Sequence, residues 1–188
     1  MKRVFIVHGR GSSPKEDWFP WIARELKKKG FTVKVLKMPN TDRPQIAPWV
    51  AHLKRSVGEP DEKTHFVGHS IGCQTIMRYL EGVDRPVGNL VLVGAWFTLK
   101  GLEKEEKPIA QPWLTKRIDT AAVRKSAEGI GVILSDDDPF VPLNANRKAF
   151  ANRLGARVTV LKNKGHIDGN AGVTRLPIAV QEIVRMSR

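Results

Sequence analysis

The residues most able to perform chemistry in this chain are Ser70, a run of three aspartates at 136–138, and His166. A serine hydroxyl is a weak nucleophile until a neighbouring base takes its proton. A histidine imidazole is suited to that task, and a carboxylate beside it fixes the tautomer and stabilises the imidazolium. Serine, acid, histidine is one of the chain orders in which such triads occur. These residues therefore predict acyl-transfer chemistry through a serine nucleophile.

Ser70 lies in segment 68–72, whose sequence Gly-His-Ser-Ile-Gly matches the pattern G-x-S-x-G. In a nucleophile elbow, this motif joins a strand to a helix by a turn that leaves no room for a Cβ at either glycine. The flanks fit, because residues 65–67 are β-prone and apolar residues recur at helical spacing as far as Leu80. The motif alone is weak, since a chain of this length contains it by chance roughly one time in twenty.

Predicted strands and helices alternate along the chain, and they must position these reactive residues. We expect strands at 4–7, 31–36, 65–67, 89–93, 130–134 and 157–161. We expect helices at 17–29 with Asp17 as N-cap, at a stretch that starts irregularly between Pro44 and Pro48 and ends at Gly58, at 71–81, at 143–154, and from about Thr174. Strands that alternate with helices predict an α/β fold, with a parallel sheet covered on both faces.

Four predicted loops carry reactive residues just past the end of a strand. They hold His8-Gly9-Arg10, Ser70, Asp138 and His166. In open α/β sheets, ligands bind beyond the carboxyl ends of the strands. We therefore expect these loops to converge on one site.

Residues 96–120 contain prolines and a charge run and show no clean period. We expect a loop or small cap there, followed by a short helix after Thr120. Aromatic residues on loops expected to overhang Ser70 are candidates for an acyl pocket, although core packing explains each of them nearly as well. They are Trp96, Phe97, Trp113 and Phe140. No repeat or linker divides the chain, so residues 1–188 are expected to form one domain.

The net charge of +13 permits attraction to nucleic acid, anionic lipid or acidic partners. The basic residues are spread along the chain without an aromatic-interleaved RNA motif, so we interpret them as a solvated basic face and disfavour nucleic-acid binding. The only cysteine, Cys73, excludes an internal disulfide, and we interpret it as a small buried hydrophobe. No apolar stretch approaches the ~20 residues of a membrane span, and we expect a cytoplasmic protein.

The remaining histidines have no partners at metal-ligand spacing. His8 and His69 flank the expected site, whereas His52 and His65 lie elsewhere. We interpret all four as structural residues. No metal and no organic cofactor is expected.

The chain resembles the small serine hydrolases typified by retinoblastoma-binding protein nine and the YdeN-like proteins, within the α/β-hydrolase superfamily. The resemblance covers nearly the whole chain and is more specific than the serine motif alone. It rests on His8-Gly9, the Trp-Phe-Pro-Trp block at 18–21, Met38-Pro39-Asn40, Trp49, residues 68–73, Pro112-Trp113, Asp-Pro-Phe-Val-Pro at 138–142, and Gly165-His166.

The resemblance implies a nucleophile at Ser70, an acid at Asp138 and a base at His166. Asp136 and Asp137 are the alternatives for the acid, but the Asp-Pro-x-Val-Pro register matches Asp138. The family pattern also implies an oxyanion hole made by the backbone N–H groups of Arg10 and Ile71. It implies a reduced α/β-hydrolase fold with a six-stranded parallel sheet in the order 2-1-3-4-5-6. Arg10 departs from the pattern, and its long cation would narrow the pocket or favour anionic substrates.

The sequence therefore predicts a serine hydrolase, carboxylesterase-like, that cleaves small esters, amides or thioesters through an acyl-enzyme intermediate. A binding or adaptor protein on a hydrolase scaffold is the alternative from another class, since fold does not fix function. A basic surface that binds nucleic acid or other anions is a second alternative. The sequence leaves open a protein partner and a choice between monomer and homodimer.

Overall fold

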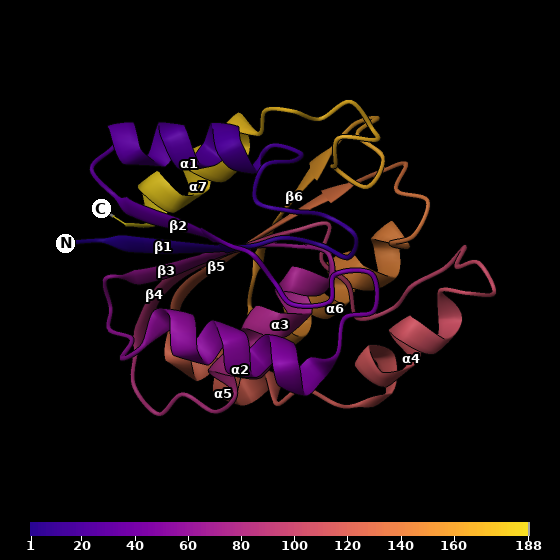
Figure 1. Ribbon diagram of the computed structural model, residues 1–188, viewed down its shortest axis with the longest axis horizontal. Coiled ribbons are helices and arrows are strands. Elements are labelled where there is room, and N and C mark those ends of the chain that lie inside the picture. Colours follow the sequence, from indigo (N-terminus) through magenta and orange to yellow (C-terminus); the bar gives the residue numbers. More distant parts are fainter. Residues whose placement is uncertain (188) are drawn as a thin grey trace.

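The computed structural model describes residues 1–187 and contains one six-stranded sheet in which every strand pair is parallel (Figure 1). The strand order is β2-β1-β3-β4-β5-β6, as the family resemblance implied. The elements along the chain are β1 (Arg3–Val7), α1 (Phe19–Lys28), β2 (Thr32–Leu36), α2 (Ile46–Val57), β3 (Thr64–His69), α3 (Ile71–Leu80), β4 (Val87–Val93), α4 (Lys107–Thr115), α5 (Thr120–Ser126), β5 (Ala127–Ser135), α6 (Leu143–Leu154), β6 (Arg157–Leu161) and α7 (Pro177–Met186).

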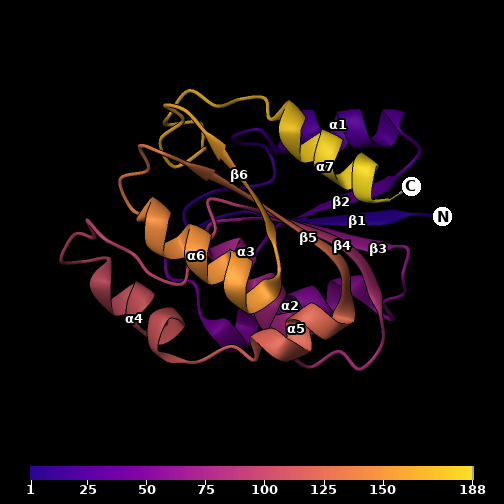
Figure 2. The same ribbon diagram turned by 180° about the vertical axis from the view of Figure 1, so that it is seen from behind.

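Helices cover both faces of this sheet. α1 and α7 pack on one face, and α2, α3, α5 and α6 lie on the other (Figures 1 and 2). α4 covers neither face and stands beyond the carboxyl ends of the strands (Figure 1). Among residues 1–187, no helix has both the length and the apolarity needed to cross a lipid bilayer.

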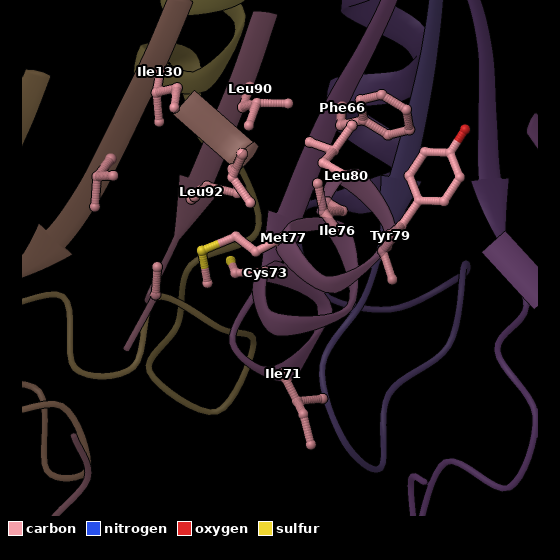
Figure 3. Close-up of a cluster of buried hydrophobic side chains, with 14 of the residues drawn as sticks. Phe66, Ile71, Cys73, Ile76, Met77, Tyr79, Leu80, Leu90, Leu92 and Ile130 are labelled. Atoms are coloured by element: carbon pink, nitrogen blue, oxygen red, sulfur yellow. The ribbon is translucent and has the colours of Figure 1, made fainter. Parts of the chain in front are cut away.

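The core forms two layers because successive side chains of a strand point to opposite faces. On β1, Val4 and Ile6 pack toward α1 and α7, whereas Phe5 and Val7 pack toward α2 and α3. β3 and β4 are buried along their whole length, as expected for central strands of a parallel sheet. Figure 3 shows the second layer, with α3 laid across side chains of the central strands.

Some element boundaries differ from the expectation. α1 begins at Phe19 and not at Asp17, which has a positive φ of 53° and does not cap the helix. Instead, the Asp17 carboxylate accepts hydrogen bonds from the Ser12 hydroxyl and the Gly169 N–H. α7 begins at Pro177, later than expected, because a proline is readily placed in the first helical turn.

The segment 96–120 contains a helix that the sequence pattern concealed. α4 has Pro108 in its first turn and Pro112 in its interior. An internal proline removes one backbone hydrogen bond and favours a break in the helix. α4 persists because its buried face is fixed by tertiary contacts, chiefly the Trp113 side chain, which is 2% exposed.

The turn between β3 and α3 depends on two glycines. Ser70 is held at φ 52°, ψ −120°, outside the regions that L-residues favour. A Cβ on Gly72 would lie 2.3 Å from the Val7 carbonyl oxygen and 2.7 Å from that of His8, and one on Gly68 would lie 2.9 Å from the Cys73 nitrogen. α3 can therefore begin directly against the end of β1, and Ser70 is pushed out at the sheet edge.

We predict that Gly72→Ala destabilises the fold by about 3 kcal/mol or more, because its methyl group would meet backbone atoms that cannot rotate away. Gly82→Ala is the control, since its Cβ would meet only the Tyr79 carbonyl oxygen at 3.8 Å. Urea denaturation of both variants measures the difference. Equal stabilities would contradict this account of the turn.

Acid should destabilise the protein through His65, which is 1% exposed on β3. Its Nδ1 accepts a hydrogen bond from the Asn89 N–H, and burial lowers its pKa from 6.5 to about 4. Between these two values only the unfolded chain takes up the proton, so acidification favours unfolding. We expect the free energy of unfolding to fall from pH 6.5 toward pH 4, by up to about 1.4 kcal/mol per pH unit from this group.

His65→Asn retains an acceptor for the Asn89 N–H but removes the titrating ring. Its free energy of unfolding, measured by urea titration at several pH values, should fall less steeply over the same range than that of the wild type. Equal slopes would rule out a contribution from His65.

Candidate active site

A continuous chain of hydrogen bonds joins Asp138, His166 and Ser70. The His166 Nδ1 lies 2.8 Å from Asp138 Oδ2, and its Nε2 lies 2.9 Å from the Ser70 hydroxyl oxygen. The three residues follow β5, β6 and β3, so they meet at the carboxyl edge of the sheet although 96 positions separate Ser70 from His166. The structure thus brings together the three residues that the sequence singled out.

The Asp138 carboxylate is almost completely buried, with 3% of the residue exposed. Its other oxygen, Oδ1, accepts hydrogen bonds from the backbone N–H groups of Phe140 at 2.9 Å and Val141 at 3.0 Å. These donors satisfy a charge that would otherwise be costly to bury, and they fix the direction of Oδ2. Asp138 can therefore orient His166 without any freedom to rotate.

Asp136 and Asp137 bind the backbone of the loop that carries His166. Asp136 Oδ1 accepts a hydrogen bond from the Asn163 N–H, and Asp137 Oδ1 accepts one from the Gly165 N–H. Hydrogen bonds from the Ser135 hydroxyl and the Gly165 N–H lower the pKa of Asp137. The three aspartates therefore have different roles: Asp136 and Asp137 bind the loop backbone, and only Asp138 contacts the imidazole.

The same loop is held from the other side by residues of β3 and the segment before α1. The indole Nε1 of Trp18 donates to the Ile167 carbonyl at 2.8 Å, and His69 Nε2 lies 2.9 Å from the His166 carbonyl oxygen. Ile167 has a φ of 57°, an unfavourable value for a β-branched residue. Side chains on both sides thus compensate the strain and fix the position of the imidazole.

His69 is a neutral donor in this arrangement. A carbonyl only accepts hydrogen bonds, so the proton of His69 lies on Nε2. Burial first, and then the neighbouring His166, lower the pKa of His69 to about 4. Its ring therefore adds no positive charge beside Ser70 near neutral pH. The structural role predicted for His69 agrees with these contacts.

The family resemblance implied an oxyanion hole made by the backbone N–H groups of Arg10 and Ile71, and both residues lie at the cleft. Arg10 follows β1, Ile71 is the first residue of α3, and both residues line the cleft with Ser70. The Ile71 N–H has no partner within α3, because the first N–H groups of a helix lack an acceptor one turn back. Such N–H groups, together with the helix dipole, suit a developing negative charge.

The Ser70 hydroxyl opens into a cleft of about 640 Å³. Trp96 and Phe140 line this cleft, and the Phe140 ring meets the His166 ring edge-on at 5.3 Å between centroids. Phe97 and Trp113 lie outside the lining, contrary to their selection as pocket candidates. The partly buried Phe97 packs against Phe150 with 4.6 Å between the ring centroids. The buried Trp113 donates from its indole to the Pro44 carbonyl.

Aliphatic residues from segment 96–120 complete the apolar wall of the cleft. They are Leu99, Leu102, Ile109 and Ala110. These residues were not among the predicted pocket residues, because only aromatic residues were selected and no helix was expected at 107–115. Ile109 and Ala110 precede Trp113 by four and three positions, and this spacing is the helical signal that could have found them.

α4 is fastened at both ends. At its start, the Glu106 carboxylate forms an ion pair with Arg10 from the loop after β1. At its end, the buried Arg78 of α3 donates to the carbonyl oxygens of Trp113 at 2.8 Å and Lys116 at 2.7 Å. These contacts hold the segment over Ser70 in the structure.

No metal centre is offered by the described residues. Within residues 1–187, no group of three or more His, Cys, Asp or Glu side chains could hold a metal ion. His8 accepts a hydrogen bond from the Met38 N–H through Nε2, and burial lowers its pKa. Cys73 is fully buried, and burial raises the pKa of its thiol, which agrees with its interpretation as a small hydrophobe.

The fold and sequence are similar to those of known hydrolases. The YdeN protein of Bacillus subtilis (strain 168) is 31% identical over 183 residues, which cover 94% of this chain and 92% of YdeN. The crystal structure of the ydeN gene product from B. subtilis matches with a TM-score of 0.90 at 28% identity, over 99% of this chain and 98% of that one.

One further protein similar in sequence and one similar in fold extend the comparison. The serine hydrolase RBBP9 of Rattus norvegicus is 28% identical over 169 residues, or 87% of this chain and 86% of RBBP9. Est1E from Butyrivibrio proteoclasticus, solved with ferulic acid, shares the fold with a TM-score of 0.75 at 13% identity, over 99% of this chain and 89% of Est1E. The sequence model of the serine hydrolase family matches residues 4–185, and the chain therefore belongs to the serine hydrolase family.

Proposed function

We propose that this protein is a carboxylesterase-like serine hydrolase that cleaves small esters through Ser70, His166 and Asp138. The observation that carries the proposal is the hydrogen-bond chain from Asp138 through His166 to the Ser70 hydroxyl at the mouth of a cleft. Membership of the serine hydrolase family supports it. The arrangement requires neither a metal nor an organic cofactor for acyl transfer.

In this mechanism, the Ser70 hydroxyl oxygen attacks the carbonyl carbon of the ester while His166 Nε2 takes the hydroxyl proton. Asp138 stabilises the imidazolium and keeps Nδ1 directed away from the serine. The N–H groups of Arg10 and Ile71 would donate to the oxygen of the tetrahedral intermediate. His166 then gives its proton to the departing alcohol, and a water molecule activated by the same imidazole releases the acyl group from Ser70.

The two walls of the cleft suggest where the parts of the substrate lie. The loop that carries His166 contributes Asp168, Gly169 and Asn170 to one wall, next to the imidazole that protonates the leaving group. The opposite wall consists largely of the aliphatic residues of segment 96–120. We therefore assign the apolar wall to the acyl group and the polar wall to the leaving alcohol.

Covalent labelling with a fluorophosphonate, read by intact mass, tests the nucleophile. We expect one adduct on the wild type and none on Ser70→Ala or His166→Ala, because the serine needs its base to react. Hydrolysis of para-nitrophenyl acetate should fall by about 10³-fold or more in both variants. Turnover by Ser70→Ala at the wild-type rate would overturn the proposal, and an unlabelled wild type would favour the alternative of a binding protein.

Substitution of the aspartates tests the assignment of the acid. Asp138→Asn should lower kcat by about 10⁴-fold, since an amide favours the wrong tautomer of the imidazole. Asp136→Asn is the matched control on the same loop and should retain most activity, because its carboxylate contacts only the Asn163 N–H. Similar losses in the two variants would mean that Asp138 acts only through the loop structure.

A further inference from the structure

The cleft that contains Ser70 is lined by an ion pair between Arg10 and Glu106. Both residues belong to the lining, and their side chains remain 39% and 21% exposed. The positive charge of Arg10 is therefore already paired with the carboxylate of Glu106. This contact joins the loop after β1 to the residue that precedes α4.

The Glu106 carboxylate is itself fixed. Its Oε2 accepts a hydrogen bond from the Glu103 N–H at 3.0 Å, while Oε1 contacts the guanidinium of Arg10. The carboxylate thus bridges its own turn and Arg10, so it has little freedom to leave the cation exposed. An anionic substrate group would have to displace this carboxylate before it could use Arg10.

The rest of the cleft offers no replacement for that cation. Apart from the two histidines His69 and His166, the other ionisable residues of the lining are acidic, namely Glu16, Asp17 and Asp168. Together with Glu106 they oppose one arginine, although the whole chain carries a net charge of +13. The carboxylates that line the cleft therefore disfavour anions there, in a protein whose total charge would attract them.

We propose that Glu106 is a specificity-determining residue, which neutralises Arg10 and makes the acyl subsite select uncharged, apolar acyl groups. This inference rests on the proposed function. From the sequence, Arg10 was expected either to narrow the pocket or to favour anionic substrates. The inference favours the first effect, because a guanidinium paired with a carboxylate still narrows the pocket but does not attract an anion. Removal of the Glu106 charge should leave Arg10 free to bind a carboxylate on the acyl chain.

A matched pair of substrates tests the proposal: para-nitrophenyl hexanoate and the mono-para-nitrophenyl ester of adipic acid, which has the same chain length but ends in a carboxylate. The wild type should have the higher kcat/KM for hexanoate. Glu106→Gln should lower this preference by about two- to fivefold at low ionic strength, the range expected for a partly exposed ion pair. Added salt should reduce the difference between the two proteins.

Glu105→Gln is the control, because Glu105 is exposed on the same turn, carries the same charge and does not belong to the cleft lining. It should keep the wild-type preference. Circular dichroism and thermal unfolding of both variants establish that they are folded, and glutamine retains an acceptor for the Glu103 N–H.

An unchanged preference in Glu106→Gln, or an equal shift in Glu105→Gln, would overturn the inference. Ser70→Ala, assayed in parallel, separates this failure from that of the proposed function. If Ser70→Ala is inactive and Glu106→Gln keeps the wild-type preference, only the role of Glu106 fails. If Ser70→Ala retains turnover, or the wild type cleaves neither ester, the proposed function fails and this inference with it.

Discussion

The constraint on which the rest of the structure depends is the close approach of α3 to the end of β1. Gly72 allows it, because any larger residue would collide with the Val7 and His8 carbonyl oxygens. The approach places the Ile71 N–H and the Ser70 hydroxyl at the edge of the sheet, next to the loop that carries Arg10. The positive φ of Ser70 is the strain that accompanies this geometry, and the buried packing of α3 compensates it.

The loop that carries His166 also contains a strained residue, and here hydrogen bonds from side chains compensate the strain. Ile167 has a positive φ, and the loop is held by Asp136 and Asp137 on one side and by Trp18 and His69 on the other. Most of these bonds join side chains to backbone groups. A loop fixed in this way presents its imidazole in one orientation, which a general base requires for efficient proton transfer.

The segment over the site owes its place to two arginines. Arg78 is 4% exposed and binds carbonyl oxygens at the end of α4, where a cation also complements the helix dipole. Arg10 binds Glu106 just before the helix begins. Charged groups therefore hold much of the apolar wall near Ser70. This links the shape of the proposed acyl subsite to the charge selectivity that we propose for it.

Strands alternate with amphipathic helices along nearly the whole chain, and this pattern was enough to predict a parallel sheet with reactive residues at its strand ends. The order of the strands came from the family resemblance. The serine motif followed from a local pattern, whereas the choice of Asp138 over Asp136 and Asp137 came from the register of the family resemblance. Three features could not be predicted from the sequence: Glu106 pairs with Arg10, Trp113 belongs to the core, and α4 is a helix despite Pro112. These outcomes depend on contacts between segments far apart in the chain, and no local period encodes such contacts.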